Sequence, residues 1–476
     1  MPVSGLNDKL ARGWTHVALR YLPFADAASA GLPLSRLLRL ALFQVAVGMA
    51  VVLLNGVLNR VMIVELGMSA ALVAVMVALP IVAAPLRALI GFRSDTHQSA
   101  LGWRRVPYIW FGSMLQFGGF AIMPFALIIL SGDTHGPLFV GHLAAALAFL
   151  LVGLGLHTTQ TAGLALATDL ADREARPRVV ALLYVMLLLG MVGSALLFSL
   201  LLEPFSQIRL IQVVQGAAAV TMLLNVVALW KQEQRRPVAR TAHRAPFLPA
   251  WRALTATRGF RRFLCAVVLG TAGFSMQEIL LEPFGAEVLG LSVSGTTLLT
   301  ALFAAGSLAA FAWAARRLAR GADPYRLAAT GALFGVVALS LVIFAGALHS
   351  ATLFRLGVLL IGFGAGLFAV CTLVKAMTFE GAGYAGLAVG AWGAARASAA
   401  GIGIALGGVI RDLVSHLAEV GVLGPTMTDP AAAYAVVYHI EIGLLFATLV
   451  AIGPLVRPAS SPALPQTRFG LAELPG

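Results

Sequence analysis

Two carboxylates and one guanidinium lie inside long apolar runs of this chain. Glu278 and Glu282 stand four residues apart in one run, with Gln277 beside them, and Arg396 lies in the middle of another. At helical spacing the two glutamates share one face of a helix. A charge in hydrocarbon costs roughly 2.5–3.5 kcal/mol on insertion scales, so each group needs a partner or a function. We expect Arg396 to pair with Glu278 or Glu282, as a structural ion pair or as a site or gate. Two residues of the last run are alternative partners for the arginine: His439 and Glu441.

A second polar group lies on the first apolar run. Its members fall within a stripe of roughly 60° when residues advance by 100° each, so they face protein or a cavity: Gln44, Gly48, Asn55 and Asn59. Hydrogen bonding between helices explains such a stripe, and the lining of a ligand cleft is the alternative. His142 and His157 lie in the fourth run. An imidazole there can ligate the magnesium of a chlorophyll, or it can hydrogen-bond a neighbouring helix.

Enzyme chemistry finds no support in the sequence. There is no glycine-rich phosphate loop with a lysine, no cluster of metal ligands and no nucleophile elbow. The Asp169-x-x-Asp172 spacing faintly resembles the acidic diphosphate site of membrane prenyltransferases, but it stands among Arg173, Glu174 and Arg176. A charge network in a loop explains it better. We therefore expect no catalytic residue and no metal site.

The composition places these residues in a membrane protein. Of the 476 residues, 59% are hydrophobic and 11% are charged, and the mean hydropathy is +0.91. Runs of about 20 apolar residues cross a bilayer as helices, because a helix satisfies its own backbone hydrogen bonds. Apolar alternation at period 2 is absent, which argues against a barrel. We predict twelve spans, at roughly 37–60, 69–92, 106–130, 138–168, 178–202, 208–231, 263–287, 293–315, 325–348, 353–379, 384–410 and 433–456.

The basic residues predict the orientation of these spans. Of the 33 Lys and Arg residues, 26 fall in, or at the edge of, segments on one side of the membrane. Only Arg60, Arg209, Arg355 and Arg411 fall on the other side. The positive-inside rule then places both termini and the 91–105 and 232–262 loops in the cytoplasm. The 232–262 loop is a topology anchor on anionic lipid, or alternatively a docking site for an acidic partner. The net charge of +13 is thus explained by the membrane, and we expect no nucleic-acid partner.

The two sets of six spans resemble each other. Residues 66–69 (LGMS) after the first span match residues 289–292 (LGLS) after the seventh. Gly153 to Leu156 in the fourth span match Gly364 to Leu367 in the tenth. Two matches in the right order indicate a duplicated six-helix unit. The predicted divisions are a cytoplasmic segment at 1–36, a six-helix bundle at 37–231, a basic linker at 232–262, a second bundle at 263–456 and a cytoplasmic tail at 457–476.

A charged motif between the second and third spans supports this architecture. A glycine, an aspartate four residues on, and then a glycine followed by basic residues resemble the recurrent motif of the major facilitator fold. The aspartate can accept hydrogen bonds from the start of a neighbouring helix. Such a cluster either latches the two halves in one state or acts as a static staple and topology signal. The motif or gate residues are Arg87, Gly91, Arg93, Asp95, Gly102, Arg104 and Arg105. The implied fold class is an all-α polytopic membrane protein of the major facilitator fold, with twelve transmembrane helices in two six-helix halves.

Longer strings resemble a more specific family. Residues 87–97 (RALIGFRSDTH) and 101–108 (LGWRRVPY) resemble the PucC/LhaA family of assembly factors for light-harvesting complexes in purple phototrophic bacteria. Three further stretches support the resemblance: 43–49, 58–67 and 276–285. The last stretch has Glu278 and Phe284 where the family pattern has Asp and Tyr. Likeness at the N-terminus favours the LhaA type, which serves the core antenna, LH1.

The resemblance implies a role in assembling LH1 around the reaction centre, by binding and handover without covalent chemistry. Bacteriochlorophyll would be bound cargo. The implied partners are LH1 antenna polypeptides, the reaction-centre core complex and chlorophyll synthase, in the bacterial inner (intracytoplasmic photosynthetic) membrane. The candidate cleft or pigment contacts are Gln44, Asn55, Asn59, His142, His157, Gln277, Glu278, Glu282 and Arg396. The alternatives are a secondary transporter of an amphipathic molecule such as a pigment precursor, coupled through Glu278, Glu282 and Arg396, and an inert scaffold for antenna helices.

Overall fold

The computed structural model describes residues 32–82, 103, 105–132, 136–172, 175–233, 247–257, 259–318, 320–377, 385–424 and 429–456. Ten helices in these ranges are long and apolar enough to cross a membrane. The second predicted span corresponds to α3 (Ala70–Val82), and the seventh to a helix broken into α10 (Phe260–Ser275) and α11 (Leu281–Glu287). The prediction of an all-helical membrane protein is confirmed. Six residues of the predicted motif lie outside the described residues: Arg87, Gly91, Arg93, Asp95, Gly102 and Arg104.

The helices follow the predicted order. The first half consists of α2 (Leu34–Val51), which continues as the π-helical segments η2 (Val52–Leu58) and η3 (Val61–Glu65), and of α3, α5 (Val106–Leu130), α6 (Leu138–Leu170), α7 (Arg176–Leu201) and α8 (Gln207–Leu229). The second half consists of α10, α11, α12 (Val293–Leu318), α13 (Pro324–Ala347), α14 (Ala351–Met377), α15 (Ala385–Glu419) and α16 (Pro430–Ile452). A short helix in the linker, α9 (Phe247–Ala256), and a final 3-10 turn, η5 (Gly453–Leu455), complete the described elements.

Local sequence explains where several spans begin. Asp323 and Asp429 each accept a hydrogen bond from the backbone N–H two residues on, at 3.0 and 2.8 Å. Ser206 does the same for the N–H three residues on, at 3.2 Å. These caps satisfy N–H groups that the first helical turn leaves without a partner. Pro324 and Pro430 follow as the first helical residues, where no N–H is needed.

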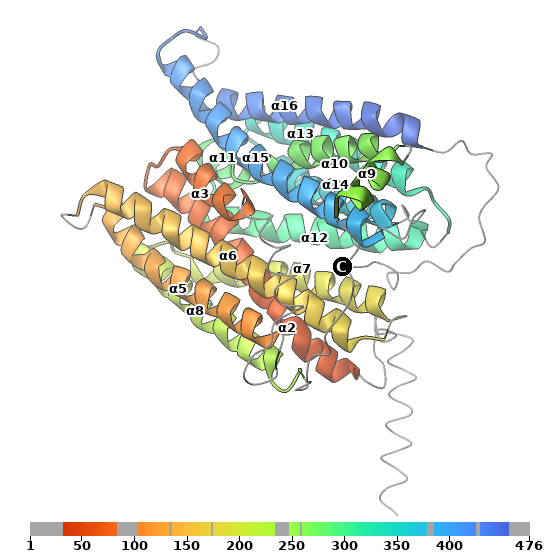
Figure 1. Ribbon diagram of the computed structural model, residues 1–476. Helices are drawn as coiled ribbons and strands as arrows, with labels where there is room; N and C mark the ends of the chain where they lie inside the picture. Colours follow the sequence, from red (N-terminus) through yellow and green to blue (C-terminus); the bar gives the residue numbers. More distant parts are fainter. Residues whose placement is uncertain are drawn as a thin grey trace, which may run out of the picture.

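The two halves repeat the same helix pairs. In the first half α5 packs on α6 and α8, and α2 packs on α7 and α8; in the second, α13 packs on α14 and α16, and α10 packs on α15 and α16. The halves meet where α3 contacts α15 and where α7 contacts α12. These two interfaces correspond under a duplication of six spans. Figure 1 shows the first half, red to yellow-green, below the second half, green to blue, with α3 against α15.

The repeated loops after the first and seventh spans share one conformation. Gly67 and Gly290 both have a left-handed backbone, with φ of 62° and 64°. The N–H of the next residue donates in each case to the carbonyl six residues earlier, at 3.0 Å for Met68 and 2.9 Å for Leu291. In both loops a side chain at the glycine position would strain the left-handed backbone that ends the helix. The loop match predicted from the sequence is therefore borne out by geometry.

The glycine match needs a shift of two residues. Gly155 approaches the carbonyl of Gly112 on α5, and Gly364 approaches the carbonyl of Gly331 on α13, in the equivalent helix pair. Gly153, which the sequence aligned with Gly364, instead packs on α3. The alignment of Gly153 with Gly364 was therefore wrong. Two short similar strings cannot show which of several neighbouring glycines on a helix contacts which other helix.

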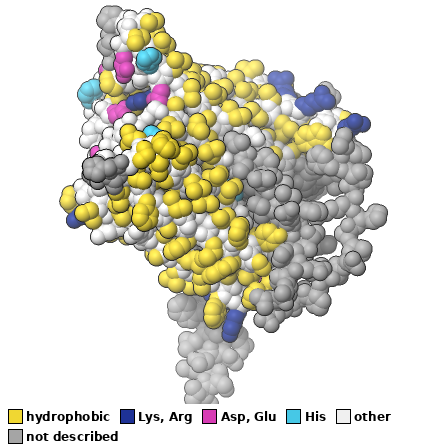
Figure 2. Space-filling model, turned by 60° about the vertical axis from the view of Figure 1, so that its left-hand side comes forward, with side chains coloured by type: hydrophobic (Ala, Val, Ile, Leu, Met, Phe, Trp, Pro, Cys, Tyr) yellow, Lys and Arg dark blue, Asp and Glu magenta, His cyan; other side chains and the backbone are white. Residues whose placement is uncertain are grey.

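The surface has the distribution expected of a membrane protein. Hydrophobic side chains cover the middle of the face shown in Figure 2, with Lys and Arg gathered at one end and Asp, Glu and His at the opposite end. Large apolar residues on the spans are exposed, among them Phe139 at 63% and Phe344 at 59%. Such exposure is stable in lipid, because lipid tails are as apolar as these side chains.

Cysteine labelling tests the predicted orientation. In a chain with Cys265→Ser and Cys371→Ala, we expect Arg261→Cys to react with a membrane-impermeant maleimide only from the cytoplasmic side. Val422→Cys, whose position is 70% exposed in the turn after α15, should react only from the outer side. We expect this labelling pattern because segments rich in Lys and Arg strongly prefer the cytoplasmic side of the membrane. Labelling of Arg261→Cys in intact spheroplasts would reverse the assigned topology.

Candidate functional site

The seventh span is interrupted by turns at residues 276–280, between α10 and α11. Pro283 has no N–H to donate to the carbonyl of Ile279, as an unbroken helix would require. Asn59, from the first span, takes this place: its Nδ2 donates to the Ile279 carbonyl at 2.8 Å. The structure places the interruption before the proline, at the carbonyl that the proline leaves without a donor.

The other side of the interruption is held by the last span. The N–H of Gln277 donates to Oε1 of Glu441, a fully buried residue of α16, at 2.9 Å. A broken helix at membrane depth is stable when neighbours satisfy its backbone groups in this way. Glu441 therefore serves the broken span, and the prediction that it is an alternative partner of Arg396 was wrong. His439 lies exposed on α16, where its Nδ1 hydrogen-bonds the Ala435 carbonyl.

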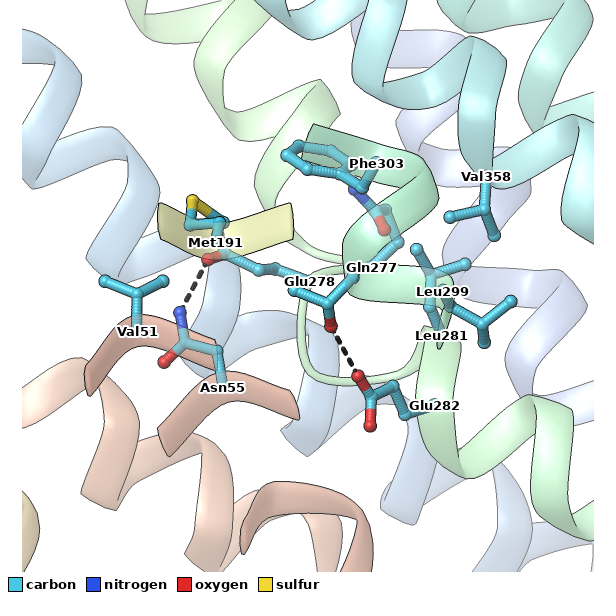
Figure 3. A pocket seen from close by; sticks show the side chains of 11 residues that line it. Val51, Asn55, Met191, Gln277, Glu278, Leu281, Glu282, Leu299, Phe303 and Val358 are labelled. Atoms are coloured by element: carbon cyan, nitrogen blue, oxygen red, sulfur yellow. Dashed lines mark hydrogen bonds between the residues drawn. The ribbon is translucent and has the colours of Figure 1, made fainter. Parts of the chain in front are cut away.

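Two hydrogen bonds join the acids of the broken span to other helices. Asn55 Nδ2, on the π-helical segment η2, donates to Oε1 of Glu278 at 2.8 Å and so connects the two halves. Thr300 Oγ1, on α12, donates to Oε1 of Glu282 at 2.7 Å. Figure 3 shows both acids pointing toward one cavity, with Asn55 approaching from the opposite side. π-Helical turns inside α-helices occur frequently at functional sites, which fits the position of Asn55.

A cavity lies between the halves at this point. Its volume is about 60 Å³, well below the ~300–1,000 Å³ usual for ligand pockets, so it holds a small polar group or a few waters unless the halves move apart. Its polar residues are Asn55, Gln277, Glu278, Glu282 and Thr300. Its apolar residues come from five segments of both halves: Val51, Met191, Leu281, Leu299, Phe303 and Val358. The mixture of apolar walls and a few convergent polar groups is typical of sites for small amphipathic molecules.

One carboxylate oxygen in the cavity lacks a partner. Glu282 is only 3% exposed, and its Oε2 has no hydrogen bond to any residue that the structure describes. A buried acceptor without a partner is costly and usually marks a site that a ligand or water completes. The side chain thus offers a bound molecule an acceptor inside an otherwise apolar chamber.

The predicted ion pair of Arg396 is absent from the described residues. Glu278 and Glu282 are hydrogen-bonded to a neutral amide and a neutral hydroxyl, and neither lies within ion-pair distance of Arg396. The guanidinium instead lies over the ring of Trp392, 5.5 Å from its centre. Trp392 is fixed by a hydrogen bond from its Nε1 to Thr372 Oγ1, at 3.1 Å. The prediction was wrong because spacing along the sequence cannot show how far apart two spans are held.

Arg396 faces the interior of the protein and is nevertheless exposed. The membrane-facing side of α15 is marked by exposed residues at helical spacing: Ala394, Ser398, Ile402, Leu406, Val409 and Leu413. Arg396 stands two residues from Ser398, about 200° around the helix, and so points to the opposite side. It lies within electrostatic range of Tyr184 of α7 and of Glu278. The contact with the Trp392 ring and the electrostatic attraction of Glu278 offset part of the cost of a charge at membrane depth.

The remaining predicted contacts do not join this cavity. Gln44 is completely buried on α2, and its amide atoms have no partner among the described residues. His142 and His157 are half-buried on α6, about 22 Å apart along the helix axis. The structure therefore divides the predicted set. Asn55, Gln277, Glu278 and Glu282 line the cavity, Asn59 supports it from behind, and Arg396 lies outside it on α15.

The described part of the charged motif acts within the first half. Arg105 Nε binds Asp169 Oδ2 at 3.1 Å, and the N–H groups of Arg105 and Val106 donate to the carboxylate of Glu233. Glu233 thereby caps the start of α5. These bonds fit the static staple, and they place Asp169 in a charge network at the end of α6.

Hydrogen bonds between the halves gather at the predicted outer end. They join the N–H of Ala71 to Asp412 Oδ2 at 2.7 Å, Ser294 Oγ to Glu203 Oε2 at 3.0 Å, and an Arg60 amino group to the Leu291 carbonyl at 3.4 Å. Gly408 also lets α15 approach α3, since a Cβ there would lie 2.6 Å from the Ala70 carbonyl oxygen. At the other end Arg36 and Arg262 bind groups of their own half. The described contacts thus close the outer end.

Three functional positions were missed from the sequence: Thr300, Glu441 as a support of the broken span, and Asp412. Thr300 stands among other Ser and Thr residues and carries no distinctive spacing. The proline at 283 was the available signal for Glu441, because a helix that cannot bond internally needs an outside partner.

The helices and their arrangement define a multi-pass membrane protein. The chain is similar in fold to a bacterial homologue of the human lysosomal transporter Spinster in an inward-facing conformation, with a TM-score of 0.64, 15% identity and coverage of 90% of this chain and 98% of that one. Other structures with this fold include peptide and nucleoside transporters. The major facilitator fold expected from the sequence is confirmed.

Sequence comparisons give the family. Residues 57–460 match the PUCC protein family. A protein of the puhA-bchM intergenic region of Rhodobacter capsulatus is 55% identical over 96% of this chain and 98% of its own length. Protein PucC of Rhodovulum sulfidophilum is 56% identical over 84% of this chain and 89% of its own length. The chain belongs to the PUCC family.

Proposed function

We propose that this protein is an assembly factor for the LH1 antenna, which binds antenna polypeptide, bacteriochlorophyll or both and hands them to the complex forming around the reaction centre. Membership of the PUCC family and the resemblance of residues 87–108 to antenna assembly factors support the proposal. Its action would be binding and release in the photosynthetic membrane, without covalent chemistry. Chlorophyll synthase is a further proposed partner, as a source of pigment.

The observation that carries the proposal is the neutral hydrogen bonding of the two cavity acids. Glu278 and Glu282 accept from an amide and a hydroxyl, and neither forms an ion pair with Arg396, although Glu278 lies within electrostatic range of it. Such a chamber binds an amphipathic molecule through acceptors and apolar walls. An ion-coupled carrier instead needs its buried acids to change charge during each cycle. Because a glutamine can accept the same hydrogen bonds, the two mechanisms make different predictions for its substitution.

A secondary transporter of an amphipathic molecule is the second candidate. The closed outer end, the broken seventh span and a cavity between two repeats favour it, because carriers bind their substrates at discontinuous helices between repeats. In that case Glu278 and Glu282 would be the coupling groups.

Glutamine and leucine variants separate the two functions. In a strain lacking the gene, we expect Glu278→Gln and Glu282→Gln to restore the LH1 absorption band, because glutamine keeps the acceptor for Asn55 and Thr300. Glu278→Leu leaves the Asn55 amide without its acceptor, a loss of ~1–3 kcal/mol, and should lower LH1 about tenfold. Membrane levels of each variant must equal those of the wild type.

A folded glutamine variant without activity would contradict handover and favour the transporter. Retention of a full LH1 band in the strain without the gene would refute the LH1 role itself. Co-purification of the wild type with bacteriochlorophyll or antenna polypeptide, measured by absorption and mass spectrometry, distinguishes binding from an indirect effect.

A further inference from the structure

A groove opens on the outside of the first half, between α7 and α8. These two helices contact each other little, although each packs on α2, so Met49 of α2 forms part of the groove lining. The walls carry exposed apolar residues, including Leu200 at 74% and Val220 at 41%. The groove has a volume of about 560 Å³. Among the described residues, the groove shares no lining residue with the central cavity, and of its residues only Glu203, which accepts from Ser294 at the outer end, belongs to the contacts between the halves described above.

The face of α8 beside this groove is polar at membrane depth. Gln212, Gln215, Gly216 and Ala219 follow helical spacing and are all exposed. Gln215 is eight residues from the start of the helix, about 12 Å along its axis, well inside a hydrocarbon layer of about 30 Å. Neither glutamine amide has a hydrogen bond to the described residues. An amide exposed to lipid without a partner is unfavourable, so this face requires an outside hydrogen-bonding group.

Other membrane-facing sides of the bundle differ from this one. The exposed residues of α6 include Leu138, Phe139 and Leu143, and those of α13 include Leu333 and Val337. These faces suit lipid chains as they stand. The contrast indicates that the α8 face is built for contact with something other than lipid.

Two glycines on α7 and α8 leave room for another transmembrane helix to approach the backbone closely. A Cβ added to Gly193 of α7 or to Gly216 of α8 would meet nothing within 4 Å. At Gly112, Gly155 and Gly331, by contrast, the missing side chain is used for contact between helices of this chain. Small residues next to amide side chains are the combination that lets transmembrane helices associate in lipid.

We propose that the α7/α8 groove binds a single transmembrane helix of a partner polypeptide, with that helix crossing at Gly216 and hydrogen-bonding Gln212 and Gln215. A lipid chain can fill the same space, but it offers the glutamine amides no acceptor. This inference rests on the proposed function for the identity of the helix, which is then an antenna polypeptide. It assigns the docking surface that handover requires, on the outside of the bundle and away from the central cavity.

Photo-crosslinking in native membranes tests the groove. A benzophenone amino acid at Leu223, 62% exposed on the same face of α8, should crosslink to an antenna polypeptide identified by mass spectrometry. The same probe at Val450, 71% exposed on α16, is the matched control and should give no such product. Crosslinks to lipid alone, to a multi-span protein, or equally at both positions would overturn the proposal.

A matched pair of glycine variants adds a second measurement. Gly216→Leu should lower the Leu223 crosslink at least about threefold, because it blocks close approach. Gly443→Leu should leave it unchanged, since Gly443 of α16 also has nothing within 4 Å of an added Cβ. Equal yields in the two variants would refute docking at Gly216.

The failure of this inference can be told from the failure of the proposed function. If the strain without the gene loses LH1 but Gly216→Leu restores it fully without any antenna crosslink, the groove assignment is wrong and the function stands. If that strain keeps LH1 while a different, identified single-span helix crosslinks at Leu223, the groove binds a helix and the antenna role is wrong.

Discussion

Replacement of Gly362 by valine is expected to prevent stable folding of the second half. Gly362 lies where α14 crosses α12, and a Cβ there would overlap the backbone carbonyl of Phe303. Gly306 and Gly366 make similarly close approaches along the same crossing, to Leu359 and Ser307. Neither backbone can move without separating two helices of the core. We expect a loss of about 3 kcal/mol or more, at the upper end of overpacking changes.

Gly443→Val is the control for this prediction. It introduces the same side chain in the middle of a transmembrane helix, at a position where nothing lies within 4 Å of the new Cβ. Thermal unfolding in detergent, followed by size-exclusion chromatography, should show wild-type behaviour for Gly443→Val and aggregation for Gly362→Val. Equal stability of the two variants would mean that α12 and α14 do not cross as closely as described.

Asp412→Ala is expected to open the outer end. The carboxylate of Asp412, on α15, accepts the N–H of Ala71 at the start of α3, and it also binds Arg411 at 3.0 Å. Arg411 in turn binds Glu287 at 2.6 Å, so one residue joins α3 to a cluster within the second half. Loss of the acceptor leaves a helix N–H without a partner, at a cost of ~1–3 kcal/mol. If closed and open states differ by a few kcal/mol, the open population rises about tenfold.

Reactivity of a cysteine in the central cavity measures this opening. Val51→Cys, in the chain without native cysteines, should react about tenfold faster with a charged maleimide added from the outer side when Asp412→Ala is present. Asp429→Ala is the matched control, because Asp429 caps an N–H of its own helix at 2.8 Å and joins no other helix among the described contacts. The same acceleration with Asp429→Ala, or none with Asp412→Ala, would show that Asp412 does not hold the halves together.

Hydropathy is enough to predict the helical architecture of this chain. A backbone in lipid must satisfy its hydrogen bonds within each segment, so the length of an apolar run predicts a span. All twelve predicted spans have a described helix, although the second is described only to residue 82 and the seventh is broken. Helix starts at Asp323 and Asp429 are equally local, because a cap needs only its own first turn. The duplicated loops at Gly67 and Gly290 are evident from four residues each.

The polar residues of the site could be predicted as a set but not as an arrangement. Glu278, Glu282 and Asn55 were identified because polar groups in apolar runs need a reason. The contacts that these residues make were not predicted, and the predicted ion pair with Arg396 was wrong. Asn55 and Glu278 are separated by 223 positions in the chain, and no local pattern records which of many polar groups on other spans lies opposite.

By itself, the sequence determined the membrane environment, the spans, the repeat and the family resemblance, since each depends on composition or on short strings of neighbouring residues. The tertiary structure alone decided where the seventh span breaks, which groups hold it, which end is closed and that, among the described residues, Arg396 contacts Trp392 and forms no ion pair with an acid. These depend on how helices cross, and a crossing is set by the shape of packed side chains and glycines from distant segments. The Ile279 carbonyl depends on both local sequence and tertiary packing. Pro283 removes the local N–H donor, and the packing of the first span against the seventh supplies Asn59 in its place.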